Sequence, residues 1–473
     1  MNRLDRLIIE TFPEESVLKD PERYTAFSGK NLPSFIKDWL IKKFTIEDHG
    51  LDTQELNDFL ETHIPHKDSR IKGRLTTDNE EVQILARIVT EPDVKSGALR
   101  FAIPDIGIKF GEGEILPYLG RRHKELKGGE VWGVAKLNYR QPQGGDKGVI
   151  ELTDYKPFKP YEVDIEYYRS VREEYTLDDW IDLLIRSMEY NPEAFTNITQ
   201  KLLFLSRLLI FVEPRLNIIE LAPKGTGKSY VFGNISKYGW LISGGTVTRA
   251  KLFYDISKNM MGIITNYDFV AMDEVQTIRF SEENELRGAL KNYLESGVFT
   301  VANIRQTATA GLILLGNIAL DANQLPMRQK YLTELPQFFR ESALLDRFHG
   351  FIEGWRLPRI NEDLKVRGYA LNVEYFSEVL HSLRGVSDFS GTVNDLVSVP
   401  RSADTRDTNS VMRLTTAYLK LLFPNVRKSD DIRKEDFEVF CLKPALEKRA
   451  IVRRQLHLMD NEFKEALPDI KVK

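Results

Sequence analysis

The segment from Ala222 to Ser229 reads A-P-K-G-T-G-K-S and combines the residue types that hold phosphate groups. It follows an apolar run that ends at Leu221 and precedes a helical pattern, so we expect a strand, a glycine-bearing loop and a helix. Glycines allow the φ angles with which backbone N–H groups surround a β-phosphate. We expect Lys228 to reach the β- and γ-phosphates of ATP, and the Ser229 hydroxyl to bind Mg²⁺. The predicted cofactor-binding residues are Pro223, Lys224, Gly225, Thr226, Gly227, Lys228 and Ser229.

Two carboxylates and one amide stand at the ends of two further apolar runs. The run YDFVAMDE ends in Asp273 and Glu274, and the run GLILLGN ends in Asn317. Asp273 is predicted to hold Mg²⁺ through water, Glu274 to orient or deprotonate the attacking water, and Asn317 to position it. An exposed acidic turn and a loop amide without a role are the plain alternatives. With a phosphate loop upstream, we interpret the three residues as catalytic.

Two arginines follow in contexts suited to phosphoryl transfer. Arg347 lies in LLDRF, and we predict that it is donated to the γ-phosphate of a neighbouring subunit, where a planar guanidinium offsets developing charge. Arg406 begins an amphipathic helix and is predicted to sense nucleotide in cis or in trans. A surface arginine and a salt bridge at a helix start are the respective alternatives. An arginine supplied in trans requires a head-to-tail interface, and such interfaces close into rings.

A short hairpin is predicted between the acidic pair and Asn317. Val298 to Val301 and Ile304 to Thr309 are β-prone runs that flank a turn at Ala302-Asn303, and Arg305 lies near the tip.

A basic stretch interleaved with aromatic residues lies in the first third of the chain. Tyr118, Trp132 and Tyr139 alternate there with lysines and arginines, a composition that can bind nucleic acid by phosphate contact and base stacking. The candidate DNA contacts are Arg121, Arg122, Lys124, Lys136 and Arg140. A solvated charged face with ordinary core aromatics is the alternative.

Changes in hydrophobic periodicity and turn composition along the chain divide it into six segments. We predict a helical region at 1–64, a β-rich barrel at 65–165, a helical linker at 166–199, an α/β ATPase core at 200–360, a helical lid at 361–450 and a helical tail at 451–473. The barrel is expected to resemble an oligonucleotide-binding (OB) module.

Composition narrows the class of protein further. The 473 residues are 42% hydrophobic and 29% charged, which suits an ordinary globular protein. The single cysteine, Cys441, excludes a disulfide framework, and a reducing cytoplasm is the simplest expected location. No stretch approaches the ~20 uninterrupted apolar residues that span a bilayer, so no membrane partner is predicted. The net charge of −4 means that any nucleic-acid surface must be local.

The order of these parts resembles an AAA+ ATPase. The stretch LESGVFTVANIRQTATAGLILLGN resembles the pre-sensor-1 hairpin region of the minichromosome maintenance (MCM) helicases, LLDRF resembles their arginine-finger segment, and the Arg406 to Arg413 spacing resembles their sensor-2 helix. In those helicases the hairpin projects into the pore of a ring and grips DNA. The resemblance therefore implies DNA contacts at Asn303 and Arg305, although the helicases usually carry lysine where this chain has Asn303.

Residues 1 to about 450 resemble the BrxL family, the AAA+ component of BREX bacteriophage-exclusion systems. The runs that carry the resemblance are YTLDDWIDLLIRSMEYNP, ELAPKGTGKSYVF, SGGTVTRAKLFYD and VAMDEVQT. The family implies hexameric rings, also paired end to end as dodecamers, that encircle and translocate on double-stranded DNA, block phage replication and meet other BREX components. Long members carry a Lon-related protease domain. We find no Ser-Lys proteolytic segment here, so we expect a short member or a truncation.

Two other functions stay open. A protein unfoldase or Lon-like protease would use an aromatic and apolar pore loop, which residues 243–262 could provide. A scaffold that uses ATP only to assemble would require the loss of Glu274 or Arg347, and both are present.

Overall fold

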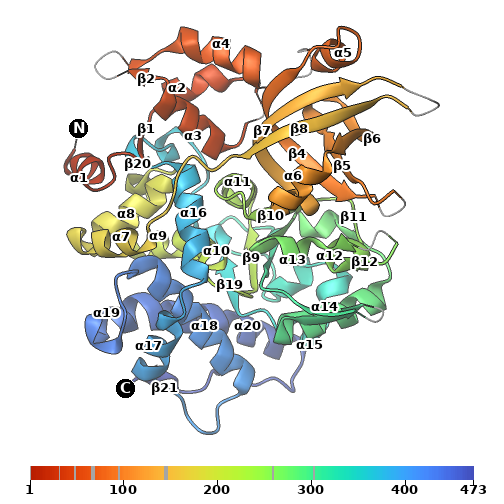
Figure 1. The fold of residues 1–473 in the computed structure, drawn as a ribbon. Coiled ribbons are helices and arrows are strands. Elements are labelled where there is room, and N and C mark those ends of the chain that lie inside the picture. Colours follow the sequence, from red (N-terminus) through yellow and green to blue (C-terminus); the bar gives the residue numbers. More distant parts are fainter. Residues whose placement is uncertain are drawn as a thin grey trace.

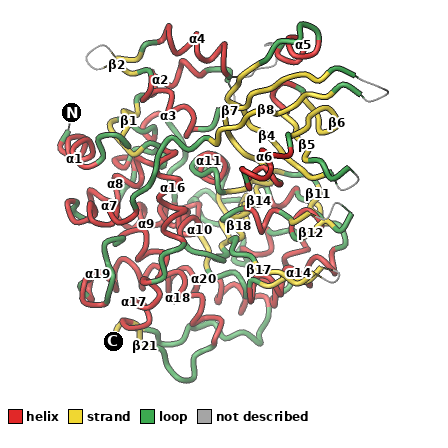
Figure 2. The backbone as a smooth tube through the Cα atoms, in the orientation of Figure 1, coloured by secondary structure: helices red, strands yellow, loops and turns green. Residues whose placement is uncertain are grey.

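The computed structural model describes residues 2–30, 32–46, 50–64, 70–93, 96–142, 147–257, 260–301 and 304–473. Figure 1 shows the N-terminal helices and a β-barrel above a central α/β region, with the C-terminal helices below it. The backbone tube of Figure 2 shows the strands gathered mainly in two places, the barrel and the central sheet.

The central sheet has five parallel strands in the order β10-β14-β18-β9-β19. Its strands are β9 (Ile218–Ala222), β10 (Gly239–Ser243), β14 (Phe269–Asp273), β18 (Gly311–Asn317) and β19 (Gly350–Glu353). β9 and β14 are buried along their whole length, as expected for strands covered on both faces. Because all five run the same way, the phosphate loop, Asp273 and Asn317 follow the same edge of the sheet.

Helices and short strands connect the sheet strands. They are α11 (Lys228–Asn234), β11 (Thr246–Val247), α12 (Arg249–Leu252), β12 (Tyr254–Asp255), β13 (Met260–Met261), α13 (Ile263–Asn266), β15 (Arg279–Phe280), α14 (Glu283–Ser296) and α15 (Ser342–Leu345).

A two-stranded hairpin stands between α14 and β18. Its strands β16 (Val298–Val301) and β17 (Ile304–Thr307) pair antiparallel, with Thr300 opposite Arg305. The base is anchored because Phe299 is fully buried, whereas Arg305 is exposed. Asn303, the other predicted tip residue, lies outside the described residues.

The barrel is closed and has its own core. Its strands are β4 (Val82–Pro92), β5 (Leu99–Ile103), β6 (Ile108–Ile115), β7 (Gly129–Arg140) and β8 (Val149–Pro157), with α6 (Pro117–Arg122) between β6 and β7. The order around the barrel is β4-β5-β6-β8-β7, and β6 and β8 are parallel. Its fully buried centre includes Ile84, Phe101 and Leu137.

The N-terminal region and the helices after the barrel frame the ATPase core. Before the barrel lie α1 (Arg3–Thr11), β1 (Ser16–Lys19), α2 (Pro21–Tyr24), α3 (Ser34–Lys43), β2 (Thr45–Ile46), β3 (Gly50–Leu51), α4 (Thr53–His63) and α5 (Ile71–Thr76). After the barrel lie α7 (Ile165–Val171), α8 (Leu177–Ser187), α9 (Ile198–Leu205) and α10 (Leu209–Val212). β1 pairs with β20 (Gly368–Leu371), which joins the start of the chain to the segment after the core sheet.

The C-terminal part is helical, except for its last residues. It contains α16 (Val373–Arg384), α17 (Asp388–Leu396), β21 (Val397–Ser398), α18 (Thr405–Leu422), α19 (Lys434–Phe437), α20 (Lys443–Met459) and β22 (Lys471–Val472). The prediction of a helical tail at 451–473 is wrong beyond Met459. There the chain passes Pro468, and β22 pairs with β21, so backbone pairing replaces the helix. None of the helices in the described ranges has the length and apolar character that a bilayer crossing requires.

Candidate nucleotide site

The loop from Ala222 to Lys228 joins β9 to α11 in the conformation that its glycines allow. Gly225 and Gly227 have φ values of 81° and 75°, in the left-handed region that favours glycine. A Cβ at Gly227 would clash with the hydroxyl of Tyr190, whereas a Cβ at Gly225 would meet open space. The loop is therefore packed against the body of the protein at Gly227 and open at Gly225.

A buried ion pair that we did not predict supports this loop from below. Arg207 and Glu220 are both fully buried, with Nε–Oε2 and Nη2–Oε1 distances of 3.0 and 2.5 Å. The third guanidinium nitrogen, Nη1, donates to the carbonyl of Thr226 at 2.9 Å. The sequence signal was Glu220 itself, because an acid inside an apolar strand requires a cationic partner.

The fold places Lys228 and Asn317, which the sequence assigned to the same nucleotide site, in direct contact. The Lys228 side chain is buried, and its Nζ donates to Asn317 Oδ1 at 3.0 Å. Burial lowers the pKa of Lys228, while the nearby charges of Glu220 and Asp273 act in the opposite direction. The ammonium group thus faces a polar region at the ends of β9 and β18.

The acidic pair lies at the end of the adjacent strand β14. Asp273 is buried, and its Oδ1 accepts a hydrogen bond from the Glu274 amide at 2.9 Å. Glu274 has a φ of 45° and an exposed side chain, so the backbone turns sharply and releases this carboxylate from the sheet. Gln276, which the sequence reading missed, fixes Asn317 by donating to its carbonyl at 2.8 Å and accepting from its amide at 3.2 Å.

The residues present fit ATP with Mg²⁺. Within the described ranges, Ser229 is exposed and its hydroxyl forms no hydrogen bond, while the Asp273 carboxylate lies near enough to Lys228 to influence its pKa. A hydroxyl, a carboxylate and an ammonium group beside an open glycine loop are the donor set that a magnesium triphosphate requires.

The two predicted arginines lie together at the other edge of the same sheet. Arg347 precedes β19, and the neighbouring His349 amide donates to Asn217 O at 2.8 Å, just before β9 begins. Since β9 has five residues, it separates this edge from the phosphate loop by about 17 Å. Arg347 and Arg406 are therefore not directed at the nucleotide loop of their own chain.

Both arginines bind one carboxylate that the sequence reading missed. Glu295 Oε2 lies 3.0 Å from Arg347 Nε and 3.1 Å from Arg406 Nε. Arg406 Nη1 also lies 3.1 Å from Asp346 Oδ2. Burial lowers the pKa of Arg347, whereas the hydrogen bond to Asp346 and the Glu295 charge raise the pKa of Arg406 despite its burial.

The predicted basic face of the barrel is divided among three places. Lys136 and Arg140 lie on β7 and pair with Glu81 and Glu151, both at 2.8 Å. The exposed Arg121 and Arg122 end α6. The following Lys124 lines a cleft instead.

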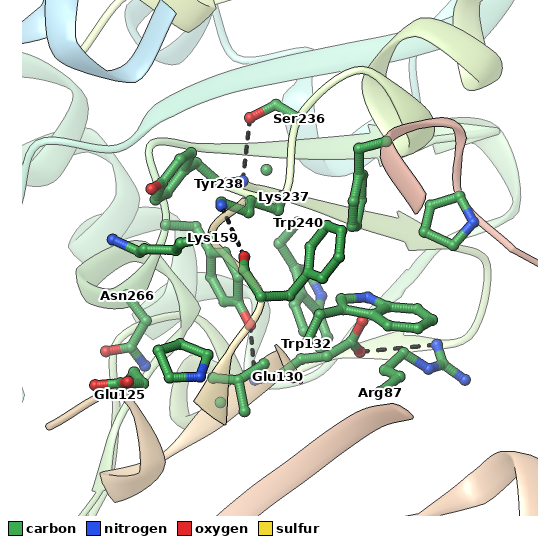
Figure 3. Close-up of a pocket in the computed structure, with 18 of the residues that line it drawn as sticks. Arg87, Glu125, Glu130, Trp132, Lys159, Ser236, Lys237, Tyr238, Trp240 and Asn266 are labelled. Atoms are coloured by element: carbon green, nitrogen blue, oxygen red, sulfur yellow. Dashed lines mark hydrogen bonds and ion pairs between the residues drawn. The ribbon is translucent and has the colours of Figure 1, made fainter. Parts of the chain in front are cut away.

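That cleft lies between the barrel and the ATPase core. It has a volume of about 660 Å³ and is lined by the barrel strand β7 and by the segment that follows α11. Trp132 faces this cleft and packs edge-on against Phe35 of α3, with 6.0 Å between ring centroids (Figure 3). This aromatic is therefore part of a contact between the barrel and α3, which favours the alternative of an ordinary core aromatic at Trp132.

The sheet order, the phosphate loop and the acidic strand end define a P-loop ATPase of the AAA+ type. Family models agree with this class. Residues 150–469 match the ATPase domain described as "Lon-like protease BrxL-like", and residues 10–139 match the "BREX system Lon protease-like protein BrxL N-terminal" domain. The chain belongs to the BrxL family.

Individual relatives agree with the family models. The chain is 28% identical over 462 residues to "Lon-like protease BrxL" of Escherichia coli O9:H4 (strain HS), covering 96% of this chain and 64% of that protein. It is 27% identical over 439 residues to the protein of the same name from Bacillus cereus (strain H3081.97), covering 90% and 63%. The chain therefore spans just under two thirds of the length of these relatives. "Uncharacterized protein 440" of Sulfolobus islandicus rod-shaped virus 1 is 28% identical over 149 residues, covering 28% and 33%.

Proposed function

We propose that this protein hydrolyses ATP as the motor of a BREX phage-defence system and couples hydrolysis to movement on double-stranded DNA. The observation that carries the proposal is the meeting of Lys228 and Asn317 at 3.0 Å, beside Asp273, where three adjacent parallel strands end. These groups come from segments up to 89 residues apart, and the fold gathers them at one strand edge.

Each residue has a role that its position supports. Lys228 and the backbone of the glycine loop hold the phosphates, and Asn317 orients the attacking water. Glu274, exposed on its turn, takes the proton from that water. Ser229 and Asp273 would hold Mg²⁺, which would neutralise charge at the phosphates.

The position of the two arginines supports assembly into a ring. In each protomer Arg347 and Arg406 lie toward the end of the sheet opposite the phosphate loop, and strand β9, about 17 Å long, runs between the two ends. A neighbour rotated about a ring axis would present this edge to the nucleotide. We propose hexameric rings, with double hexamers as a further assembly, in which Arg347 completes the site in trans and Arg406 contacts the same nucleotide.

DNA contact is assigned to the hairpin and the barrel. The hairpin is anchored at Phe299 and exposes Arg305, which suits a lever that touches a phosphate backbone. The barrel has five strands, one parallel pair and a helix between its third and fourth strands, an arrangement that supports an OB-like module. We propose that the protein acts in the cytoplasm with other BREX components.

Electron microscopy with an ATP analogue tests the assembly, with and without duplex DNA. Rings with density in the central channel only when DNA is present support the proposal. Particles that stay monomeric with bound analogue would refute the ring, and rings that exclude DNA would refute the DNA role. Loss of ATP binding in Lys228→Ala tests the site independently.

A protein-remodelling function is the second candidate, because the relatives are named Lon-like proteases. The segment of β12 and β13 exposes Ile256 and Met261, with 57% and 37% of their surfaces accessible, as a pore loop for polypeptide would. ATP-dependent unfolding of a tagged substrate protein without DNA would favour this candidate. DNA-stimulated hydrolysis without unfolding would favour the motor.

A further inference from the structure

A polar cluster of two buried side chains and one partly exposed tyrosine lies directly behind the nucleotide site. Tyr230 follows Ser229 on α11, and its hydroxyl hydrogen-bonds Glu189 Oε2. Ser34 Oγ, at the start of α3, donates to the same Glu189 oxygen at 2.7 Å and lies 2.8 Å from the Tyr230 hydroxyl. Three segments far apart in sequence therefore meet in one triad, Ser34–Glu189–Tyr230.

The position of Glu189 is fixed by the backbone and by a lysine. Glu189 has a φ of 71°, just past the end of α8. Its Oε1 lies 3.1 Å from Lys19 Nζ, and Lys19 also pairs with Asp38. Burial opposes ionisation of Glu189, but the Lys19 charge and the hydroxyl hydrogen bonds hold its pKa below the usual value. Glu189 thus accepts hydrogen bonds from both hydroxyl groups while Lys19 balances its charge.

The residue after Glu189 contacts the phosphate loop itself. The Tyr190 hydroxyl lies 3.5 Å from the Gly227 carbonyl, and no side chain can be added at Gly227 without displacing that hydroxyl. Glu189 and Tyr190 therefore hold α11 and the loop from the same side. A shift of the loop has to move this pair or break the hydrogen bonds that the two residues make to Tyr230 and Gly227.

The other side of the triad leads to the barrel. Ser34 is followed by Phe35, whose ring packs on Trp132 of β7 at 6.0 Å and on Phe158 at 6.1 Å. Both aromatics line the cleft of Figure 3. Two consecutive residues of α3 thus face in different directions: Ser34 contacts Glu189 and Tyr230, and Phe35 contacts the barrel.

A second contact lies where the segment after α11 meets the same cleft. Lys237 Nζ donates to the Phe158 carbonyl at 3.3 Å (Figure 3). It also pairs with Glu374 and Glu378 of α16, each at 2.5 Å. Lys237, which follows α11, therefore contacts both the segment that leaves the barrel after β8 and the C-terminal helix α16. A hydrogen bond from the Glu130 amide of β7 to the Tyr267 hydroxyl at 3.1 Å joins the barrel to the core as well, so these contacts together resist motion of the barrel against the core.

We propose that the Ser34–Glu189–Tyr230 triad positions the phosphate loop and transmits nucleotide binding to α3 and the barrel. The inference rests on the proposed nucleotide binding at Lys228. Tyr230 and Glu189 act through the loop and not on the reacting atoms, so they are positioning residues. When bound nucleotide shifts the phosphate loop and α11 toward the phosphates, Tyr230 moves with them. Its hydrogen bond to Glu189, and that of Glu189 to Ser34, then transmit the shift to α3.

Hydrogen exchange of α3, measured with and without a non-hydrolysable ATP analogue, tests this coupling. In the wild-type protein we expect saturating analogue to slow exchange across 34–43 by about five-fold, the order of one added hydrogen bond. Tyr230→Phe removes only the hydroxyl and should abolish this change while analogue still binds. Tyr167→Phe is the matched control, because the Tyr167 hydroxyl donates to Thr11 O at 2.5 Å, outside the triad.

Ser34→Ala is a second variant that breaks the triad from the α3 side and should give the same loss. A nucleotide effect on α3 that persists in Tyr230→Phe and Ser34→Ala would overturn the proposal, as would wild-type protein that binds analogue without a change in α3. Wild-type protein that binds no analogue would instead refute the proposed function, and with it the inference.

Discussion

Replacing Arg207 with methionine separates the structural role of the buried ion pair from its role in nucleotide binding. The guanidinium holds Glu220 with two hydrogen bonds and the Thr226 carbonyl with a third. Because both side chains have no accessible surface, removing the cation leaves a buried carboxylate unpaired. Such a loss costs about 3–5 kcal/mol, and the orphaned Thr226 carbonyl adds about 1 kcal/mol.

Hydrogen exchange of the β9 amides measures the first cost directly. A loss of this size should speed their exchange by roughly two to four powers of ten. The double variant Arg207→Met/Glu220→Leu replaces both partners with apolar side chains and should recover most of the protection, since a buried pair is often no better than a well-packed apolar contact.

Nucleotide affinity should behave differently in the two variants. The Thr226 carbonyl lacks its donor in both, so the glycine loop loses its support, and we expect the Kd for an ATP analogue to rise about ten-fold in each. Full recovery of affinity in the double variant would refute a positioning role for Arg207. A change of less than about ten-fold in β9 exchange of the single variant would refute the assignment of a strong buried pair.

Four further predictions follow from the site. Glu274→Gln should retain ATP binding but lower turnover by about 100-fold or more in a steady-state phosphate-release assay, because the proton acceptor is lost; wild-type turnover would remove Glu274 from that role. Arg347→Ala and Lys228→Ala should each be inactive alone. In a one-to-one mixture about a quarter of the interfaces pair the intact phosphate loop of an Arg347→Ala subunit with the intact arginine of a Lys228→Ala subunit, and these interfaces should hydrolyse ATP. A mixture that stays inactive would contradict action in trans. Arg305→Ala should reduce DNA-stimulated hydrolysis, leave basal hydrolysis unchanged and lower the salt slope of DNA binding by about one, and an unchanged slope would count against a phosphate contact. Burial raises the pKa of Glu374 to about 7, although the charge of Lys237 acts in the opposite direction. Between pH 4.5 and about 7 the folded chain therefore binds a proton that the unfolded chain has released, and the free energy of unfolding should fall as the pH rises through this range. Glu374→Gln should accordingly stabilise the protein more at pH about 8 than at pH about 5.5, as measured by denaturation midpoints.

The parts of the site that sequence could predict are those whose signals are local. The glycine loop, the acidic pair and Asn317 each follow an apolar run that became a buried parallel strand, and the fold only had to set those strands side by side. The hairpin strands were equally local, since alternation and a turn define them. The local pattern of apolar, polar and glycine residues was enough to identify these segments.

The supporting residues could not be found in this way because their meaning depends on distant partners. Arg207, Gln276 and Glu295 are ordinary polar residues in sequence, and each becomes specific only when the fold brings a carboxylate, a strand end or two arginines to it. The partners of the basic stretch could not be predicted for the same reason. The carboxylates that neutralise Lys136 and Arg140 come from Glu81 and from Glu151 on β8, which no local pattern reveals.

The shared carboxylate of Glu295 bears on how the two arginines would act between subunits. The pairs that Glu295 forms with Arg347 and Arg406 are partly exposed, and pairs of that kind contribute about 0.2–1 kcal/mol each. A triphosphate in a neighbouring subunit carries more charge and can displace so weak a partner. Asp346 is different, since it is almost fully buried and is also held by Arg449 at 2.6 Å. Beside Glu295, the Arg347 guanidinium contacts, among the described residues, only the uncharged Ala343 carbonyl four residues back, whereas Arg406 stays anchored through the buried Asp346. Arg347 is therefore the arginine better suited to reorient toward a neighbour.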